Sequence, residues 1–133
     1  GKAKSLLMGH ALTPMFLELP FPPSAKQYWR YYKGRVLKSR VAKSYIKAVG
    51  LSWMTMKKEG FPKDSRLDME IQVFPKDRRA RDLDNLLKIT LDSLEAAKVF
   101  ENDKQVDAIR IVRREQHPEG KMLVLIKPIE KEK

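Results

Sequence analysis

The sequence contains no cysteine, and this absence excludes disulfides, zinc–thiolate centres and cysteine nucleophiles. Histidine is almost as scarce: His10 and His117 are far apart in the chain, and no HExxH zinc motif is present. No apolar run approaches the roughly 20 residues that a membrane-spanning helix needs. We therefore predict a protein that does not span a membrane and does not use thiol chemistry.

Acidic residues are outnumbered by basic ones, 17 to 28, which gives a net charge of +11. This charge predicts a polyanionic partner, with nucleic acid the first candidate and an anionic membrane surface the second. The imbalance is strongest in residues 19–58, which hold ten lysines or arginines, seven aromatic residues and no acidic residue. Basic groups neutralise phosphates and aromatic rings stack on unpaired bases, so the segment predicts binding of DNA or RNA. Tyr45 and Trp53 are expected to belong to the core instead.

A length of 133 residues indicates one domain. The short apolar run in residues 6–12 faintly resembles a signal peptide, but a glycine and a histidine interrupt it. We interpret residues 1–14 as a leader, flexible or in part foreign to the natural protein. Residues 15–128 are then the folded domain, and residues 129–133 are a frayed C-terminal tail.

Hydrophobic periodicity predicts a single-domain, two-layer α/β sandwich with a small mixed sheet, two main helices and the order β-α-β-α-β-β. The first helix begins after Ser39 as N-cap, and whether it continues beyond Gly50 is left open. Residues 25–37 are expected to be a loop, and Pro118 to Gly120 a hairpin-like connection between the last two strands. The predicted strands cover residues 15–21, 67–74, 105–114 and 121–127, and the second helix covers residues 83–98.

Carboxylates gather among arginines in the segment RDLDNLLK, residues 81–88. One interpretation is structural: Asp82 caps the helix and Asp84 forms an i,i+4 ion pair with Lys88. The other is catalytic: the carboxylates hold Mg²⁺ for phosphodiester cleavage, and Lys88 stabilises negative charge on the phosphate. The turn FENDK offers a third carboxylate, Asp103, but a helix of about 15 residues would place this turn near the helix's far end. The spacing alone leaves both interpretations open.

Two motifs resemble the RusA-type Holliday junction resolvases, which are small bacterial and prophage endonucleases. The stronger motif is RDLDNLLKITLDSLEAAKVFENDKQV, residues 81–106, and the weaker is LPFPPSAKQYWR, residues 19–30. The resemblance spans most of residues 16–127, and it identifies residues 15–128 as a RusA-like nuclease domain.

The resemblance implies metal-dependent chemistry on branched DNA. The family's motif lysine falls on Lys88, and its three metal-binding, catalytic aspartates fall on Asp82, Asp84 and Asp103. Asp103 is therefore expected to approach the other two. The resemblance also implies a homodimer that makes paired nicks in four-way junctions, with Mg²⁺ or Mn²⁺ and no organic cofactor. Such a protein would serve recombination and repair in the cytoplasm of a bacterial host.

Basic residues within and beside these motifs are predicted to contact the DNA backbone. Many relatives carry an asparagine where this chain has Ala25-Lys26, which leaves its substrate preference open. Asp92, on the same helix as Asp84, is expected to be a structural or solvated residue rather than a metal ligand. The alternative function is a non-catalytic nucleic-acid-binding module of phage or bacterial origin, in which the aspartates are caps and ion-pair partners. The predicted DNA contacts are Lys26, Arg30, Lys33, Arg35, Arg40, Lys43, Lys47, Arg78, Arg79 and Arg81.

Overall fold

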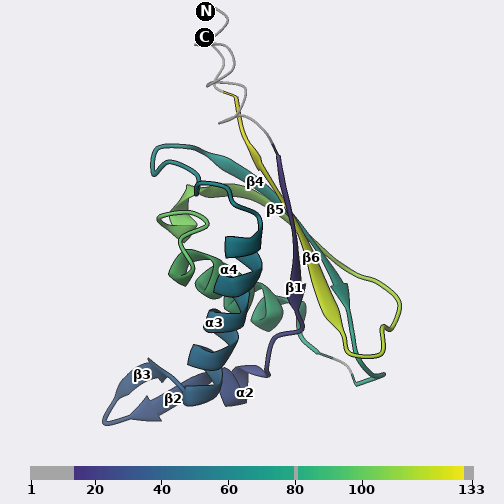
Figure 1. The fold of residues 1–133 in the computed structure, drawn as a ribbon. Coiled ribbons are helices and arrows are strands. Elements are labelled where there is room, and N and C mark those ends of the chain that lie inside the picture. Colours follow the sequence, from purple (N-terminus) through teal and green to yellow (C-terminus); the bar gives the residue numbers. More distant parts are fainter. Residues whose placement is uncertain (1–13, 80, 131–133) are drawn as a thin grey trace, which may run out of the picture.

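The computed structural model of the protein describes residues 14–79 and 81–130. A four-stranded sheet forms one layer, and the two long helices lie together against one of its faces (Figure 1). This arrangement confirms the predicted mixed α/β architecture. The predicted leader, apart from Pro14, and residues 131–133 of the predicted tail lie outside the described residues. Within the described part of the chain, no helix is long and apolar enough to cross a membrane.

The helices and strands have the following bounds. The helices are α2 (Ala25–Tyr28), α3 (Arg40–Thr55), α4 (Leu83–Ala96) and the 3₁₀ turn η1 (Asp103–Gln105). The strands are β1 (Met15–Pro20), β2 (Trp29–Tyr32), β3 (Arg35–Lys38), β4 (Leu67–Phe74), β5 (Val106–Arg113) and β6 (Lys121–Pro128).

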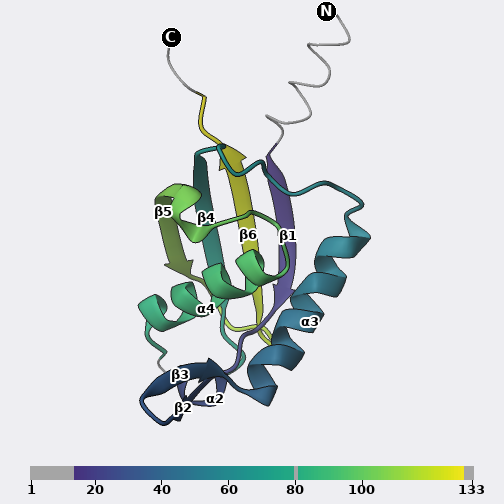
Figure 2. The same ribbon diagram turned by 90° about the vertical axis from the view of Figure 1, so that its left-hand side faces the viewer.

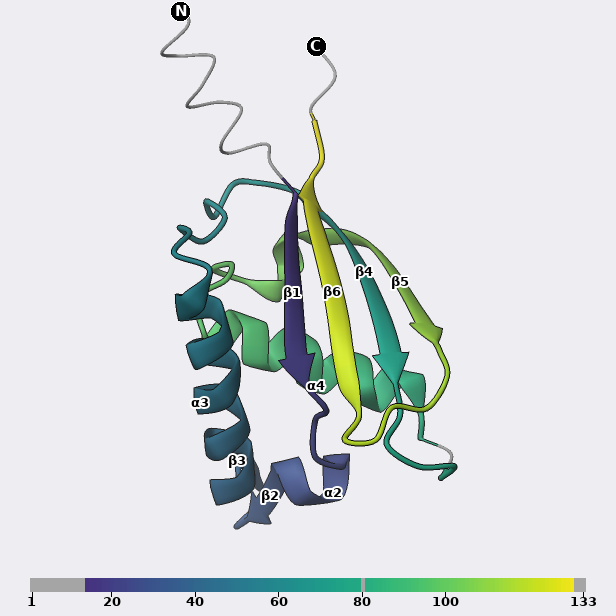
Figure 3. The ribbon, with the colours of Figure 1, turned by 45° about the vertical axis from the view of Figure 1, so that its right-hand side comes forward.

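The main sheet has the strand order β1-β6-β4-β5, which Figure 3 shows from its open face. Strands β4 and β5 are parallel because α4 carries the chain back between them, as a parallel connection requires. Strand β6 is antiparallel to both β1 and β4 and lies between them. The expected hairpin-like connection between the last two strands is therefore wrong. The chain passes the end of β4 instead, where the His117 N–H donates to the Pro75 carbonyl at 2.9 Å.

The core lies between the sheet and the two long helices. Strand β4 alternates buried and half-buried residues along its whole length, as its sequence predicts. Helix α3 continues past Gly50 and buries Tyr45 and Trp53, which confirms their expected place in the core.

Helix α4 turns a slightly different face to the core than its leucine spacing suggests. Leu86, Ile89 and Leu94 are buried. Three leucines expected in the core or beside it are only half-buried, and they form a strip along the flank of the helix. These are Leu83, Leu87 and Leu91.

The predicted loop over residues 25–37 contains the short helix α2 and the β2–β3 hairpin, which the predicted element order lacks. Ser24 and Gln27 form a capping box at the start of α2. The hairpin turns through Lys33 and Gly34, whose φ angles of 49° and 74° are typical of a tight two-residue turn. Figure 1 shows the hairpin extending away from the main sheet.

Candidate active site

Asp82 and Asp84 lie at the exposed beginning of α4. Asp82 occupies the N-cap position, yet its side chain makes no capping hydrogen bond. Neither Asp82, Asp84 nor Lys88 belongs to any ion pair within residues 14–79 and 81–130. The structural interpretation is confirmed for the N-cap position of Asp82, but neither its capping hydrogen bond nor the Asp84–Lys88 ion pair is present among the described residues. Two exposed carboxylates thus lie at one end of the helix without an ion-pair partner among the described residues.

Lys88 lies one helical turn beyond Asp84 and is positioned by an aromatic ring. Its Nζ lies 5.4 Å from the ring centroid of Trp29, within the range of a cation–π interaction. Trp29 begins strand β2, so the basic, aromatic segment reaches the helix that carries the aspartates. The ammonium group stays exposed and free of a carboxylate partner within the described chain.

Arg81, one of the predicted DNA contacts, pairs with a carboxylate in the loop before α4. Its Nη1 lies 2.8 Å from Asp77 Oδ1, and its guanidinium lies 5.0 Å from the ring centroid of Phe21. Hydrogen bonds from the Arg81 side chain and the Arg79 backbone N–H lower the pKa of Asp77 to about 2. Arg113 adds a hydrogen bond from its Nη2 to the Arg81 carbonyl at 2.6 Å. The role of Asp77 was not predicted from the sequence, although its i,i+4 spacing to Arg81 was a signal for the pair.

A cavity of about 620 Å³ lies between the Pro22–Gln27 segment and the beginning of α4. Asp82 lines it together with four basic residues. Lys26, Arg79 and Arg81 were predicted DNA contacts, and Lys76 was not. Basic groups around a carboxylate offset its repulsion of a phosphate backbone. The arrangement therefore suits the approach of an anionic substrate to Asp82.

Asp103 lies at the other end of α4. It begins η1, and its backbone N–H donates to Glu95 Oε1, in the last turn of α4, at 2.7 Å. The helix between Asp82 and Glu95 gives a separation on the order of 20 Å. No group of three acidic or histidine side chains able to hold a metal occurs within the described residues. A single chain thus brings together Asp82 and Asp84 but does not bring Asp103 to them.

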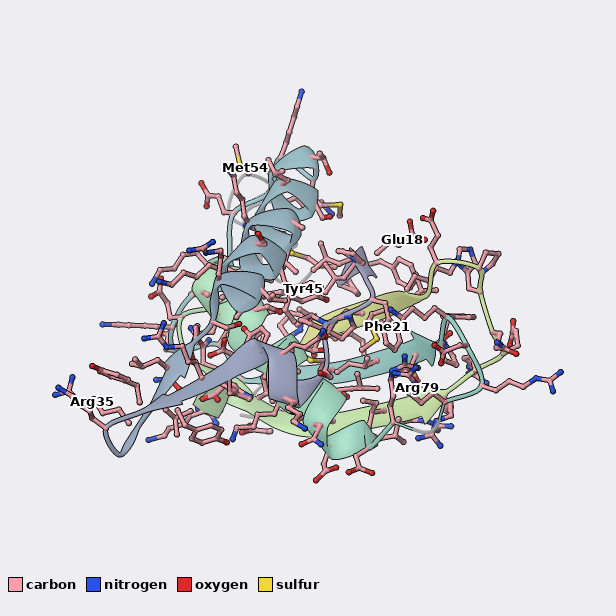
Figure 4. The ribbon with its side chains drawn as sticks, turned by 90° about the horizontal axis from the view of Figure 1, so that it is seen from below. Glu18, Phe21, Arg35, Tyr45, Met54 and Arg79 are labelled. Atoms are coloured by element: carbon pink, nitrogen blue, oxygen red, sulfur yellow. The ribbon has the colours of Figure 1, made fainter. Side chains whose placement is uncertain are left out.

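The other predicted DNA contacts lie on exposed surfaces of neighbouring elements. Figure 2 shows α2, the β2–β3 hairpin and the beginning of α3 together at the end of the molecule away from the C-terminal end of β6. Seen from below, Arg35 lies at the outer end of the hairpin and Arg79 beside Phe21 (Figure 4). Among the predicted contacts, Arg81 is half-buried. The other predicted contacts are exposed, and these are Lys26, Arg30, Lys33, Arg35, Arg40, Lys43, Lys47, Arg78 and Arg79.

The chain is similar to a family of nucleases over most of its length. Residues 20–126 match the family model described as endodeoxyribonuclease RusA. The crossover junction endodeoxyribonuclease of Enterobacteria phage HK97 is 38% identical over 112 residues, which are 84% of this chain and 92% of the phage protein. The proteins of the same name from Escherichia coli K12 and Enterobacteria phage 82 are each 34% identical over 98 residues, 73% of this chain and 80% of theirs.

Proposed function

Because the chain belongs to the RusA endodeoxyribonuclease family, we propose that it is a Mg²⁺-dependent endonuclease that resolves four-way DNA junctions by paired, symmetric nicks. The observation that carries this proposal is that two carboxylates with no described ion-pair partner, Asp82 and Asp84, lie at the beginning of α4, and that Asp82 lines a cavity together with basic residues. The relatives are named for crossover junctions and come from phages and enterobacteria. A role in recombination and repair in the cytoplasm of a bacterial host follows from that likeness.

The residues at the beginning of α4 fit a magnesium ion. Mg²⁺ takes oxygen ligands, commonly one or two carboxylates together with waters and substrate phosphates. Asp82 and Asp84 supply two carboxylates that no described cation neutralises. When bound, such an ion supplies positive charge to the scissile phosphate and lowers the pKa of a bound water.

The protein's own side chains then orient the DNA and stabilise its charge. Lys88, held over Trp29, stabilises negative charge on the phosphate as the bond breaks. Arg78 and Arg79 contact the flanking backbone. The Asp77–Arg81 pair keeps the loop that carries them in place. This division explains why one arginine of the cluster is half-buried while its neighbours remain exposed.

A homodimer completes the metal site with Asp103 of the second copy. If two α4 helices lie antiparallel about a two-fold axis, the end carrying Asp103 in one copy meets the end carrying Asp82 and Asp84 in the other. The half-buried strip of Leu83, Leu87 and Leu91 offers apolar surface for this contact. Two symmetric sites also match two symmetric nicks. The separation of Asp103 from the aspartate pair within one chain supports this arrangement.

Magnesium binding distinguishes the nuclease from the alternative, a non-catalytic nucleic-acid-binding module. We expect isothermal titration with MgCl₂ to show a saturable site in the wild type. Affinity should fall at least about tenfold in Asp82→Asn/Asp84→Asn, because both carboxylate charges are lost. Glu18→Gln is the matched control, since Glu18 is exposed on β1 and paired only to Lys121 among the described residues. Equal binding by the wild type and the double variant would exclude this metal site and favour the module.

A further inference from the structure

The β2–β3 hairpin exposes apolar side chains that the core does not use. Tyr31 is 76% exposed, Val36 58% and Tyr32 51%. Tyr31 and Val36 are cross-strand partners, so they share one face of the hairpin. Side chains of this kind, grouped on a projecting element, indicate a contact surface rather than part of the fold.

The charge of the hairpin favours a polyanion over a second copy of the chain. Residues 29–38, WRYYKGRVLK, include four basic residues and no acidic one. Arg30 and Lys33 place their charges 5.5 Å and 5.3 Å from the ring centroid of Tyr32. Two such hairpins would repel each other across a symmetric interface. Flat rings flanked by cations instead match exposed base faces flanked by phosphates.

Both ends of the hairpin are fixed to one carboxylate on α4. Asp92 accepts a hydrogen bond from the buried Tyr28 hydroxyl at the hairpin's start, and Lys38 Nζ at its end lies 3.2 Å from Asp92 Oδ2. Burial and the Asp92 hydrogen bond raise the pKa of Tyr28, so its hydroxyl remains a donor. The Ser39 N–H also donates to the Tyr28 carbonyl at 2.9 Å. Asp92 therefore has the structural role expected of it, and it joins the hairpin to the helix that carries Asp84.

The hairpin is attached to α4 near the centre of the proposed dimer. In the antiparallel arrangement of two α4 helices, the two-fold axis passes beside the middle of each helix. The hairpin contacts α4 at Lys88, through Trp29, and at Asp92, through Tyr28 and Lys38. These two positions flank the midpoint of α4. A symmetric four-way junction bound to the dimer has its branch point on the same axis.

We propose that the β2–β3 hairpin recognises the branch point, where Tyr31 and Tyr32 stack on base pairs that have lost a stacking neighbour. This inference rests on the proposed junction-cleaving function and names the structural feature of the DNA that the protein selects. A linear duplex exposes such a base face only at its two ends. The hairpin therefore contributes to selectivity for junctions rather than to general affinity for DNA.

Binding measured in EDTA tests the hairpin without involving the metal site. A labelled four-way junction and a linear duplex of the same sequence are titrated with the wild type and Tyr31→Ala/Tyr32→Ala. We expect junction affinity to fall at least about tenfold in the double variant, because stacking on two bases is lost. Duplex affinity should stay within about twofold, since all four cations of the hairpin are retained. Tyr31→Phe/Tyr32→Phe, which keeps the rings, and Phe16→Ala, which removes another exposed ring, should bind like the wild type.

Two further measurements separate the alternatives. A 2-aminopurine base at the branch point should change its fluorescence on binding the wild type but not the Tyr31→Ala/Tyr32→Ala variant. Unchanged junction selectivity in that variant would overturn the proposal. A shift of the variant from dimer to monomer in size-exclusion chromatography would also overturn it, because the hairpin would then be a subunit interface. If the wild type selects junctions in EDTA through its tyrosines but does not nick them with Mg²⁺, the nuclease proposal fails and the hairpin proposal stands.

Discussion

Replacing Asp84 with asparagine is expected to reduce nicking of a four-way junction at least about a hundredfold, because a carboxylate proposed to bind the metal is lost. Junction binding should stay as tight as in the wild type or become tighter, since the change removes a negative charge beside the phosphate backbone. Single-turnover nicking in Mg²⁺ and gel-shift titration in EDTA measure the two effects separately. Glu18→Gln removes a carboxylate of similar exposure from β1 and should change neither.

The separation of cleavage from binding is the informative part of this result. Asp84 forms no ion pair within residues 14–79 and 81–130, so its loss breaks no described contact that supports the fold. A variant that cleaves at the wild-type rate would show that the metal site is elsewhere. A variant that loses cleavage and binding together would indicate that Asp84 supports the DNA-binding surface rather than the chemistry.

Two inactive variants are expected to restore activity to each other when they share one dimer. In a heterodimer of Asp84→Asn and Asp103→Asn subunits, one site carries both substitutions and the other carries neither, provided that Asp103 acts across the subunit interface. Heterodimers purified through two different affinity tags should nick at about half the wild-type rate per dimer, because one of two symmetric sites is intact. The product should be a junction nicked in one strand.

A control heterodimer shows whether this rescue depends on Asp103 acting across the subunit interface. Asp82 and Asp84 lie on the same chain at the same end of α4, so a heterodimer of Asp82→Asn and Asp84→Asn has no intact site. It should remain inactive. Absence of rescue in the Asp84→Asn and Asp103→Asn heterodimer would contradict a shared site, and Asp103 would then need a role at its own end of the helix.

Local sequence patterns predicted the elements that carry the site. The alternation of residues 67–74 identified β4 because one face of that strand is buried along its whole length. Ser39 was identified as the N-cap of α3, and its side chain does accept from the Ala42 N–H. The start of α4 was predicted in the same way, from Asp82 as a candidate N-cap. In each case the signal comes from residues close in sequence, which is where pattern reasoning is strongest.

The hairpin and the sheet order were not predicted, for different physical reasons. The Lys33-Gly34 turn was visible between β-forming residues, but neither strand lies over the core and so neither shows a buried alternating face. The insertion of β6 between β1 and β4 depends on contacts between strands distant in sequence. No local pattern specifies such an order.

The candidate site was predictable only in part. RDLDN placed Asp82 and Asp84 together at a helix start because their spacing is local. The length of α4 indicated that Asp103 would lie at its far end, while the family resemblance implied an approach to the pair. The structure places Asp103 beside Glu95. The proposed dimer would reconcile the two expectations, because Asp103 of one copy would meet Asp82 and Asp84 of the other. A single sequence does not show the symmetry of an assembly.

The most direct test of the account is cleavage of a labelled synthetic four-way junction, resolved on a denaturing gel, in the presence of linear duplex competitor. The account predicts paired nicks at symmetry-related positions with Mg²⁺, no nicks in EDTA, and no cleavage of the linear duplex. Tight junction binding without nicks, in Mg²⁺ and in Mn²⁺ and across several junction sequences, would contradict it. The protein would then be a binding module built on the nuclease scaffold.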